Sequence, residues 1–135
     1  MRKRGAALAA GSLLLGLGLV PMTAATSAAA TLSCTATATY SAAWNNGFVF
    51  EVLVTNTGTE SFNTWVVTFD MPPGYVVDSV WNGQETQTGQ HVIVRGGGPG
   101  YNIAPGSSVL AFGGIAQGVP EGGFTNITCT PGVVL

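Results

Sequence analysis

Eight short runs of β-forming residues, separated by glycine, proline and asparagine, constrain this chain more than any other feature. The good helix formers leucine, lysine, glutamate and arginine are scarce after residue 30. Turn sequences such as Pro72-Pro73-Gly74 and Pro105-Gly106 lie between the runs. The pattern predicts an all-β fold, an antiparallel β-sandwich of about seven to nine strands. The runs are Cys34–Tyr40, Gly47–Asn56, Asn63–Asp70, Tyr75–Trp81, Gln84–Thr88, His91–Arg95, Ser107–Ala116 and Gly123–Cys129.

Hydrophobic residues alternate along three of these runs, as they do on a strand that buries one face. The residues predicted to face the core are Phe48, Phe50, Val52 and Val54 in the second run, Trp65, Val67 and Phe69 in the third, and Leu110 and Phe112 in the seventh. The opposite face of each sheet is left for solvent or for a ligand.

The first 30 residues have the pattern of a secretory signal peptide. Basic residues 2–4 precede an uncharged apolar stretch over residues 5–20, and a run of small residues ends at Ala30. A membrane span needs about 20 apolar residues, more than this stretch has. We therefore expect cleavage after Ala30, a secreted, extracellular chain of residues 31–135, and no membrane contact after cleavage. A retained signal anchor is the alternative.

The chain after residue 30 carries little charge. Arg95 is its single basic residue, against six acidic ones. Nucleic acids and anionic membrane surfaces are bound by basic patches, so both are excluded as partners.

Cys34 and Cys129 are the two cysteines of the chain and lie near the ends of the predicted mature part. In an exported protein we expect them to form a disulfide, with two free buried thiols as the alternative. Closing so long a loop stabilises a small domain by about 4–5 kcal/mol in the chain-entropy model.

Groups that catalyse reactions or hold metal ions are scarce. His91 is the single histidine and lies in a polar turn, and no serine has the G-x-S-x-G context of a nucleophile. Asp70 and Asp78 are the nearest candidates for a glycosidase pair, but each lies beside a turn, which is typical of surface carboxylates. Metal sites need several His or Cys ligands. We predict no metal, no cofactor and no enzymatic activity.

Two tryptophans and one tyrosine fall outside the alternation. Trp44 lies in a turn-like segment before a strand, Trp81 ends a run directly before Asn82-Gly83, and Tyr101 lies in a Gly-Pro-Gly-Tyr-Asn loop. Such rings either cap the ends of a core or form an exposed stacking surface. A pyranose ring offers an apolar C–H face to an aromatic ring, a contact that we estimate at about 0.5–1.5 kcal/mol by analogy with aromatic pairs. The exposed alternative predicts binding to a neutral polysaccharide.

Three motifs follow one another between the two cysteines: Trp44-x-x-Gly47-Phe48, Val54-Thr55-Asn56-x-Gly58 and Trp81-Asn82-Gly83. Together with the cysteines they resemble a family 2 carbohydrate-binding module, a bacterial module that binds cellulose and in some branches xylan or chitin. The resemblance covers essentially the whole chain from residue 31 to residue 135. It implies an immunoglobulin-like sandwich and a disulfide between the terminal cysteines.

The resemblance also implies a binding site made of three aromatic rings in a flat row. By motif these are Trp44, Trp81 and Tyr101, the last standing where tryptophan is usual. Asn82 and Asn102 become candidates for hydrogen bonds to sugar hydroxyl groups.

Two further positions refine the expected ligand and the expected core. Trp65 corresponds to a core tryptophan of the family, in agreement with its alternation. Gly47 stands where xylan-binding members carry arginine, which favours cellulose or chitin. The expected function is non-catalytic binding of an insoluble β-1,4-linked polysaccharide by a secreted monomer. The alternatives are a carrier of an apolar small molecule, as in enediyne apoproteins, and an adhesion module.

Overall fold

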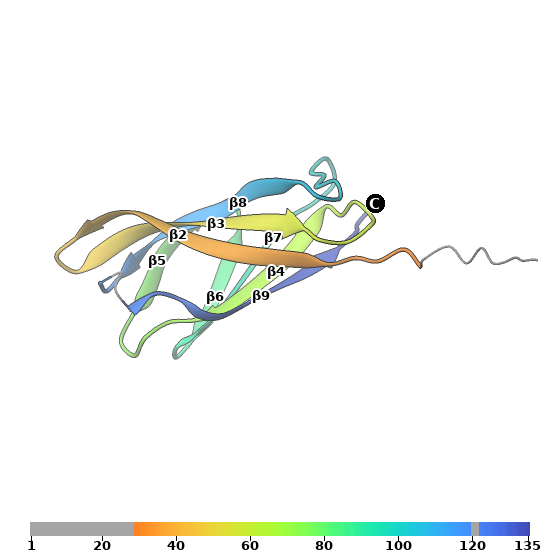
Figure 1. The fold of residues 1–135 in the computed structure, drawn as a ribbon. Helices are drawn as coiled ribbons and strands as arrows, with labels where there is room; N and C mark the ends of the chain where they lie inside the picture. Colours follow the sequence, from red (N-terminus) through yellow and green to blue (C-terminus); the bar gives the residue numbers. More distant parts are fainter. Residues whose placement is uncertain (1–28, 120–121) are drawn as a thin grey trace, which may run out of the picture.

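Two four-stranded antiparallel sheets pack face to face in the computed structural model, which describes residues 29–119 and 122–135 (Figure 1). The predicted signal peptide over residues 1–30 lies almost entirely outside the described residues. The described part contains eight strands and no α-helix, so the prediction of an all-β antiparallel sandwich is confirmed. No helix capable of crossing a membrane occurs in the described ranges.

The first sheet has the strand order β2-β3-β8-β5 and the second has the order β6-β7-β4-β9. Two of the predicted runs match their strands at both ends, and β2 extends beyond its predicted end at Tyr40 to include Trp44. The strands are β2 (Cys34–Trp44), β3 (Gly47–Asn56), β4 (Thr64–Asp70), β5 (Val76–Trp81), β6 (Gln84–Thr88), β7 (His91–Gly97), β8 (Ser108–Gln117) and β9 (Thr125–Gly132).

The core lies between the sheets and is built by alternation, as predicted. Full burial of one large apolar side chain stabilises a fold by about 1.5–3 kcal/mol. Trp65 of β4 stacks across the sandwich on Phe112 of β8, with ring centroids 5.1 Å apart and an interplanar angle of 21°. The inward residues of β3 and β4 are Phe48, Phe50, Val52, Val54, Trp65, Val67 and Phe69, all of them buried.

The predicted inward position of Leu110 is wrong. A β-bulge shifts the pairing of β8 with β3, so that Phe112 pairs with Val52 but Leu110 pairs with Leu53. Because a bulge inserts one extra residue, the alternation changes phase. Phe112 is buried, whereas Leu110 is 60% exposed.

The expected disulfide is present. Cys34 and Cys129 are bonded and join β2, an edge strand of the first sheet, to β9, an edge strand of the second. The bond closes the sandwich along one side, between residues at opposite ends of the sequence.

Candidate functional site

Trp44 is the last residue of β2 and pairs with Gly47, the first residue of β3, across the two-residue turn Asn45-Asn46. It therefore belongs to a strand end, and the predicted placement in a turn is corrected. Its neighbour Ala43 pairs with the inward residue Phe48, so the pleat directs Trp44 to the solvent face of the first sheet. The Trp44 side chain is 49% exposed.

The Trp44 indole packs on the backbone of Gly47. A Cβ atom at Gly47 would lie 2.5 Å from both Cε2 and Nε1 of Trp44. Since real Cβ contacts are not this short, only glycine allows the ring to lie in this position.

Trp81 repeats this arrangement at the other edge of the sheet. It is the last residue of β5 and pairs with Gly113 of β8, where a Cβ atom would lie 2.5 Å from Trp81 Cζ2. The preceding residue, Val80, pairs with Gly114, whose Cβ position faces the core residue Phe50. Trp81 therefore faces solvent, and it is 42% exposed.

The two indoles lie on one face of one sheet. Gly47 of β3 pairs with Gln117 of β8, and Gly113 pairs with Glu51 of β3. The two glycines that support the indoles are therefore separated by the segment from Gly47 to Glu51, a length of about 13 Å for an extended strand. Sheet register brings together two tryptophans that are distant in the sequence.

Tyr101 lies near the part of β8 that comes before Gly113, the glycine under Trp81. The Tyr101 side chain is 63% exposed and lines a pocket together with Val109 and Leu110. Val109 and Leu110 precede Gly113 on β8, whereas Gln117, which lies near Trp44, follows Gly113. Along β8 the order is thus Trp44, Trp81, Tyr101, and we call these three residues the aromatic row.

The segment that carries Tyr101 is held by hydrogen bonds at both ends. The Gly98 N–H donates to Asn63 O at 2.7 Å, and the Tyr101 N–H donates to Gly98 O at 3.1 Å. After the tyrosine, Ile103 forms an isolated bridge with Phe62. These contacts fix the loop against the strands beneath it.

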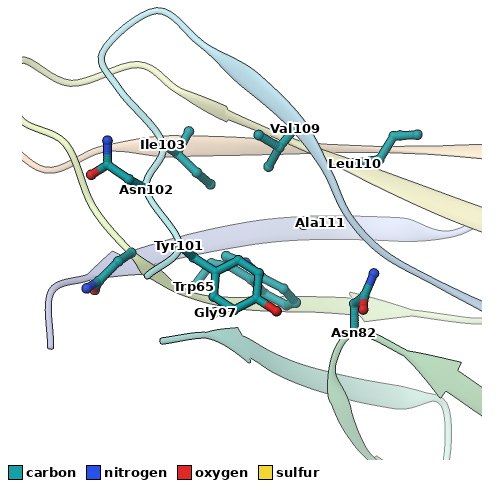
Figure 2. A pocket seen from close by; sticks show the side chains of 10 residues that line it. Trp65, Asn82, Gly97, Tyr101, Asn102, Ile103, Val109, Leu110 and Ala111 are labelled. Atoms are coloured by element: carbon teal, nitrogen blue, oxygen red, sulfur yellow. The ribbon is translucent and has the colours of Figure 1, made fainter. Parts of the chain in front are cut away.

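Both predicted asparagines lie beside Tyr101. Asn82 and Asn102 line the same pocket of about 140 Å³, together with the Trp65 indole (Figure 2). Figure 2 shows the hydroxyl end of Tyr101 directed towards the side on which Asn82 lies. Asn82 has a positive φ of 64°, a conformation that asparagine tolerates better than most residues.

Two polar features near the aromatic row were missed in the sequence, one on the first sheet and one formed by residues of the second. The Gln117 side-chain amide donates to Asp78 Oδ1 at 2.9 Å, and Gln117 pairs with Gly47 next to Trp44. Arg95, Gln84 and Tyr101 line a second, wider hollow of about 490 Å³. Neither feature has a local sequence signal, because each depends on which strands become neighbours.

One pair of ionisable side chains, His91 and Asp70, lies on the second sheet. His91 Nδ1 is 2.8 Å from Asp70 Oδ1, and the Asn126 amide donates to Asp70 Oδ2 at 2.9 Å. The Asn126 hydrogen bond, then His91, lowers the pKa of Asp70. No group of three or more His, Cys, Asp or Glu side chains that could hold a metal ion occurs in residues 29–119 and 122–135.

Comparisons with known proteins show what the chain is similar to. The chain is 38% identical to chitinase C of Streptomyces lividans, over 97% of this chain and 22% of that protein. The chain thus spans about a fifth of the length of the chitinases it matches. It is 35% identical to a cellulose/chitin binding protein of Mycobacterium tuberculosis, over 78% of this chain and 69% of that protein.

Solved structures give the same result. The chitin-binding domain of Chi18aC from Streptomyces coelicolor superposes with a TM-score of 0.60 and 36% identity, covering 74% of this chain and 92% of that one. The cellulose-binding family 2 domain from ScLPMO10C gives a TM-score of 0.57 and 31% identity, covering 75% and 98%. The family described as "Cellulose binding domain" matches residues 34–129. The chain therefore belongs to the cellulose-binding domain family, family 2 of the carbohydrate-binding modules, as its motifs predicted.

Proposed function

We propose that this protein binds the surface of an insoluble β-1,4-linked polysaccharide of the cellulose or chitin type, without catalysing a reaction. The observation that carries the proposal is the placement of Trp44 and Trp81 on glycines of one solvent-exposed sheet face, with Tyr101 next in order along β8. The family and the names of the relatives support the same ligand class.

The physical basis is stacking of sugar rings on aromatic rings. One contact of this kind is worth about 0.5–1.5 kcal/mol by analogy with aromatic pairs, so a single ring binds weakly. Several rings on one rigid sheet act together, because the first contact raises the effective concentration for the next. A crystalline polymer chain has little conformational entropy left to lose on binding.

Polar groups beside the aromatic row can orient the bound sugar chain through hydrogen bonds. Asn82 and Asn102 next to Tyr101, and Gln117 next to Trp44, offer amide donors and acceptors to hydroxyl groups. A neutral polysaccharide suits a face on which contacts are made by rings and amides. We propose further that the protein acts as a secreted monomer after removal of residues 1–30.

The alternative of a small-molecule carrier has less support. The apolar pocket beside Tyr101 has a volume of about 140 Å³. Pockets that enclose drug-sized ligands have volumes of about 300–1,000 Å³.

The experiment is a pull-down of the purified protein with microcrystalline cellulose, chitin and insoluble xylan. The double variant Trp44→Ala/Trp81→Ala is expected to stay in the supernatant, and Tyr101→Ala to bind more weakly than wild type. Ile93→Ala, on the solvent face of β7 in the second sheet, is the control and should bind as wild type. Retention of the double variant on the solid would refute this site.

Soluble oligosaccharides separate this function from adhesion to a protein partner. Cello- or chito-oligosaccharides are expected to compete with binding to the solid. Binding to a protein surface would be unaffected by them, even if it required the same rings.

A further inference from the structure

Tyr101 lines two hollows, one with mostly apolar walls and one with polar walls. On one side is the pocket of about 140 Å³, whose walls include Ile103, Val109 and Leu110. On the other is the polar hollow of about 490 Å³ with Arg95 and Gln84. Asn82, Gly97 and Tyr101 line both, so a sugar stacked on Tyr101 would reach an apolar cavity and a set of polar donors together.

The smaller pocket combines apolar walls with amides. Trp65, Ile103, Val109 and Leu110 supply carbon surface, and Asn82 supplies an amide group, whereas the Asn102 amide points away from Tyr101 (Figure 2). A group with a methyl end and an amide end matches this lining. The four heavy atoms of an acetamido group need about as much room as four waters, or roughly 120 Å³, which the pocket provides.

The pocket is formed by well-anchored parts of the fold. Trp65 is only 5% exposed and is stacked on Phe112. The backbone at Gly97 has a φ of 85°, and a Cβ atom there would lie 2.2 Å from Asn63 O. The end of β7 thus approaches Asn63 more closely than a residue with a side chain allows, which fixes this side of the pocket.

We propose that this pocket receives the 2-acetamido group of an N-acetylglucosamine unit stacked on Tyr101, so that this end of the aromatic row selects chitin over cellulose. The inference rests on the proposed function. A glucose unit carries only a hydroxyl group at this carbon, which would leave the walls formed by Val109 and Leu110 in contact with water. Arg95, in the wider hollow, would donate hydrogen bonds to oxygen atoms on the other side of the same sugar.

The test compares two soluble hexamers that differ at this carbon, chitohexaose and cellohexaose, by calorimetric titration of the purified protein. Wild type is expected to bind chitohexaose more tightly by about fourfold or more, the ratio that burial of one methyl group gives. Val109→Phe, which fills the pocket, should bring the two affinities to within about twofold. Ile93→Phe, the same kind of enlargement on the second sheet, should leave the wild-type ratio unchanged.

Two further measurements cover the case in which Val109→Phe does not fold. Leu110→Ala removes an exposed wall residue and should lower the ratio without unfolding the protein. In the wild-type complex, the acetamido methyl protons of chitohexaose should give nuclear Overhauser effects to the methyl groups of Val109 or Leu110.

The outcomes separate this inference from the proposed function. Equal wild-type affinity for both hexamers, with binding lost in Trp44→Ala/Trp81→Ala, would overturn the acetamido pocket and leave polysaccharide binding intact. A wild-type preference that persists in folded Val109→Phe would also overturn the pocket. Binding to the solids with no measurable affinity for chitohexaose would likewise overturn the pocket alone. Failure to bind cellulose and chitin as solids would overturn the proposed function itself, and this inference with it.

Discussion

The indole of Trp81 packs on the backbone of Gly113, where a Cβ atom would lie 2.5 Å from Cζ2 and 2.7 Å from Cε2 of the ring. The next residue, Gly114, faces the other way. A Cβ atom at Gly114 would lie 2.5 Å from Ser79 O and 2.6 Å from Cζ of Phe50 in the core. Two adjacent glycines therefore serve different purposes, one supporting an exposed ring and the other accommodating a buried one.

This difference makes Gly113→Ala and Gly114→Ala a matched pair. In Gly113→Ala the half-exposed Trp81 ring can move into solvent, so binding to cellulose or chitin should weaken about 2- to 10-fold, the equivalent of one aromatic contact. In Gly114→Ala the new methyl group meets backbone and core, which should cost about 1–3 kcal/mol of stability. Urea unfolding and depletion isotherms measure the two effects. Wild-type binding by Gly113→Ala would contradict the role assigned to the glycine.

The three tryptophans should differ sharply in their effect on stability. Trp65→Ala removes a buried ring stacked on Phe112 and is expected to cost about 3–5 kcal/mol. Trp44→Ala and Trp81→Ala should stay within about 1 kcal/mol of wild type, because both side chains are half-exposed. Chemical denaturation of the three variants checks this order. An equal loss of stability at all three positions would show that the exposed indoles are part of the core.

Asn56 is a buried polar residue, and both the nitrogen and the oxygen of its side-chain amide are hydrogen-bonded. Its amide donates to Glu60 O and to Ile103 O, each at 2.8 Å, and its Oδ1 accepts from the Gly58 N–H at 2.8 Å. Asn56→Ala leaves these groups unpaired and should cost about 2–4 kcal/mol.

The contact with Ile103 gives Asn56→Ala a second effect, on the segment after Tyr101. Hydrogen exchange should be faster at the Ile103 N–H, which in wild type donates to Phe62 O at 2.9 Å. Asn56→Asp is a second test and should also speed this exchange, because it keeps the acceptor for Gly58 but loses the donor to Ile103 O. Unchanged exchange at Ile103 in both variants would show that Asn56 does not hold this segment.

The disulfide between Cys34 and Cys129 links residues separated by 95 positions. The double variant Cys34→Ser/Cys129→Ser is expected to lose about 4–5 kcal/mol of stability, since the unfolded chain is no longer cross-linked. Thermal and urea unfolding of the variant, and of reduced wild type, measure this loss. Binding by the fraction that remains folded should be unchanged, because neither cysteine belongs to the aromatic row.

The pKa of Asp70 is held below its ordinary value of 3.8, first by the Asn126 hydrogen bond and then by His91. Because the folded-state pKa is the lower one, the stability that these contacts contribute is present above about pH 4 and is lost as the pH falls through the lowered pKa. Asn126→Ala should raise the pKa of the Asp70 carboxyl, as measured by carbon-detected NMR titration. His91→Gln should raise it less, and an unchanged pKa in Asn126→Ala would refute the assignment.

Local rules predicted much of this fold. Alternation identified the inward residues of β3 and β4, since a period of two is a property of each strand alone. Turn residues located the ends of most strands to within a few positions. The alternation failed at Leu110, because a bulge arises from the pairing of β8 with β3 and leaves no mark in the run itself.

The sequence by itself determined the class of fold, the pairing of the only two cysteines and the choice of Trp44, Trp81 and Tyr101 as the residues to consider. Only the tertiary structure decided that Trp44 and Trp81 share one face, that Gly47 and Gly113 support them, and that Tyr101 borders a pocket with Val109 and Leu110. The physical reason is that alternation and turn chemistry act between neighbours in the chain. Register, bulges and pockets depend instead on contacts between strands that are distant in sequence.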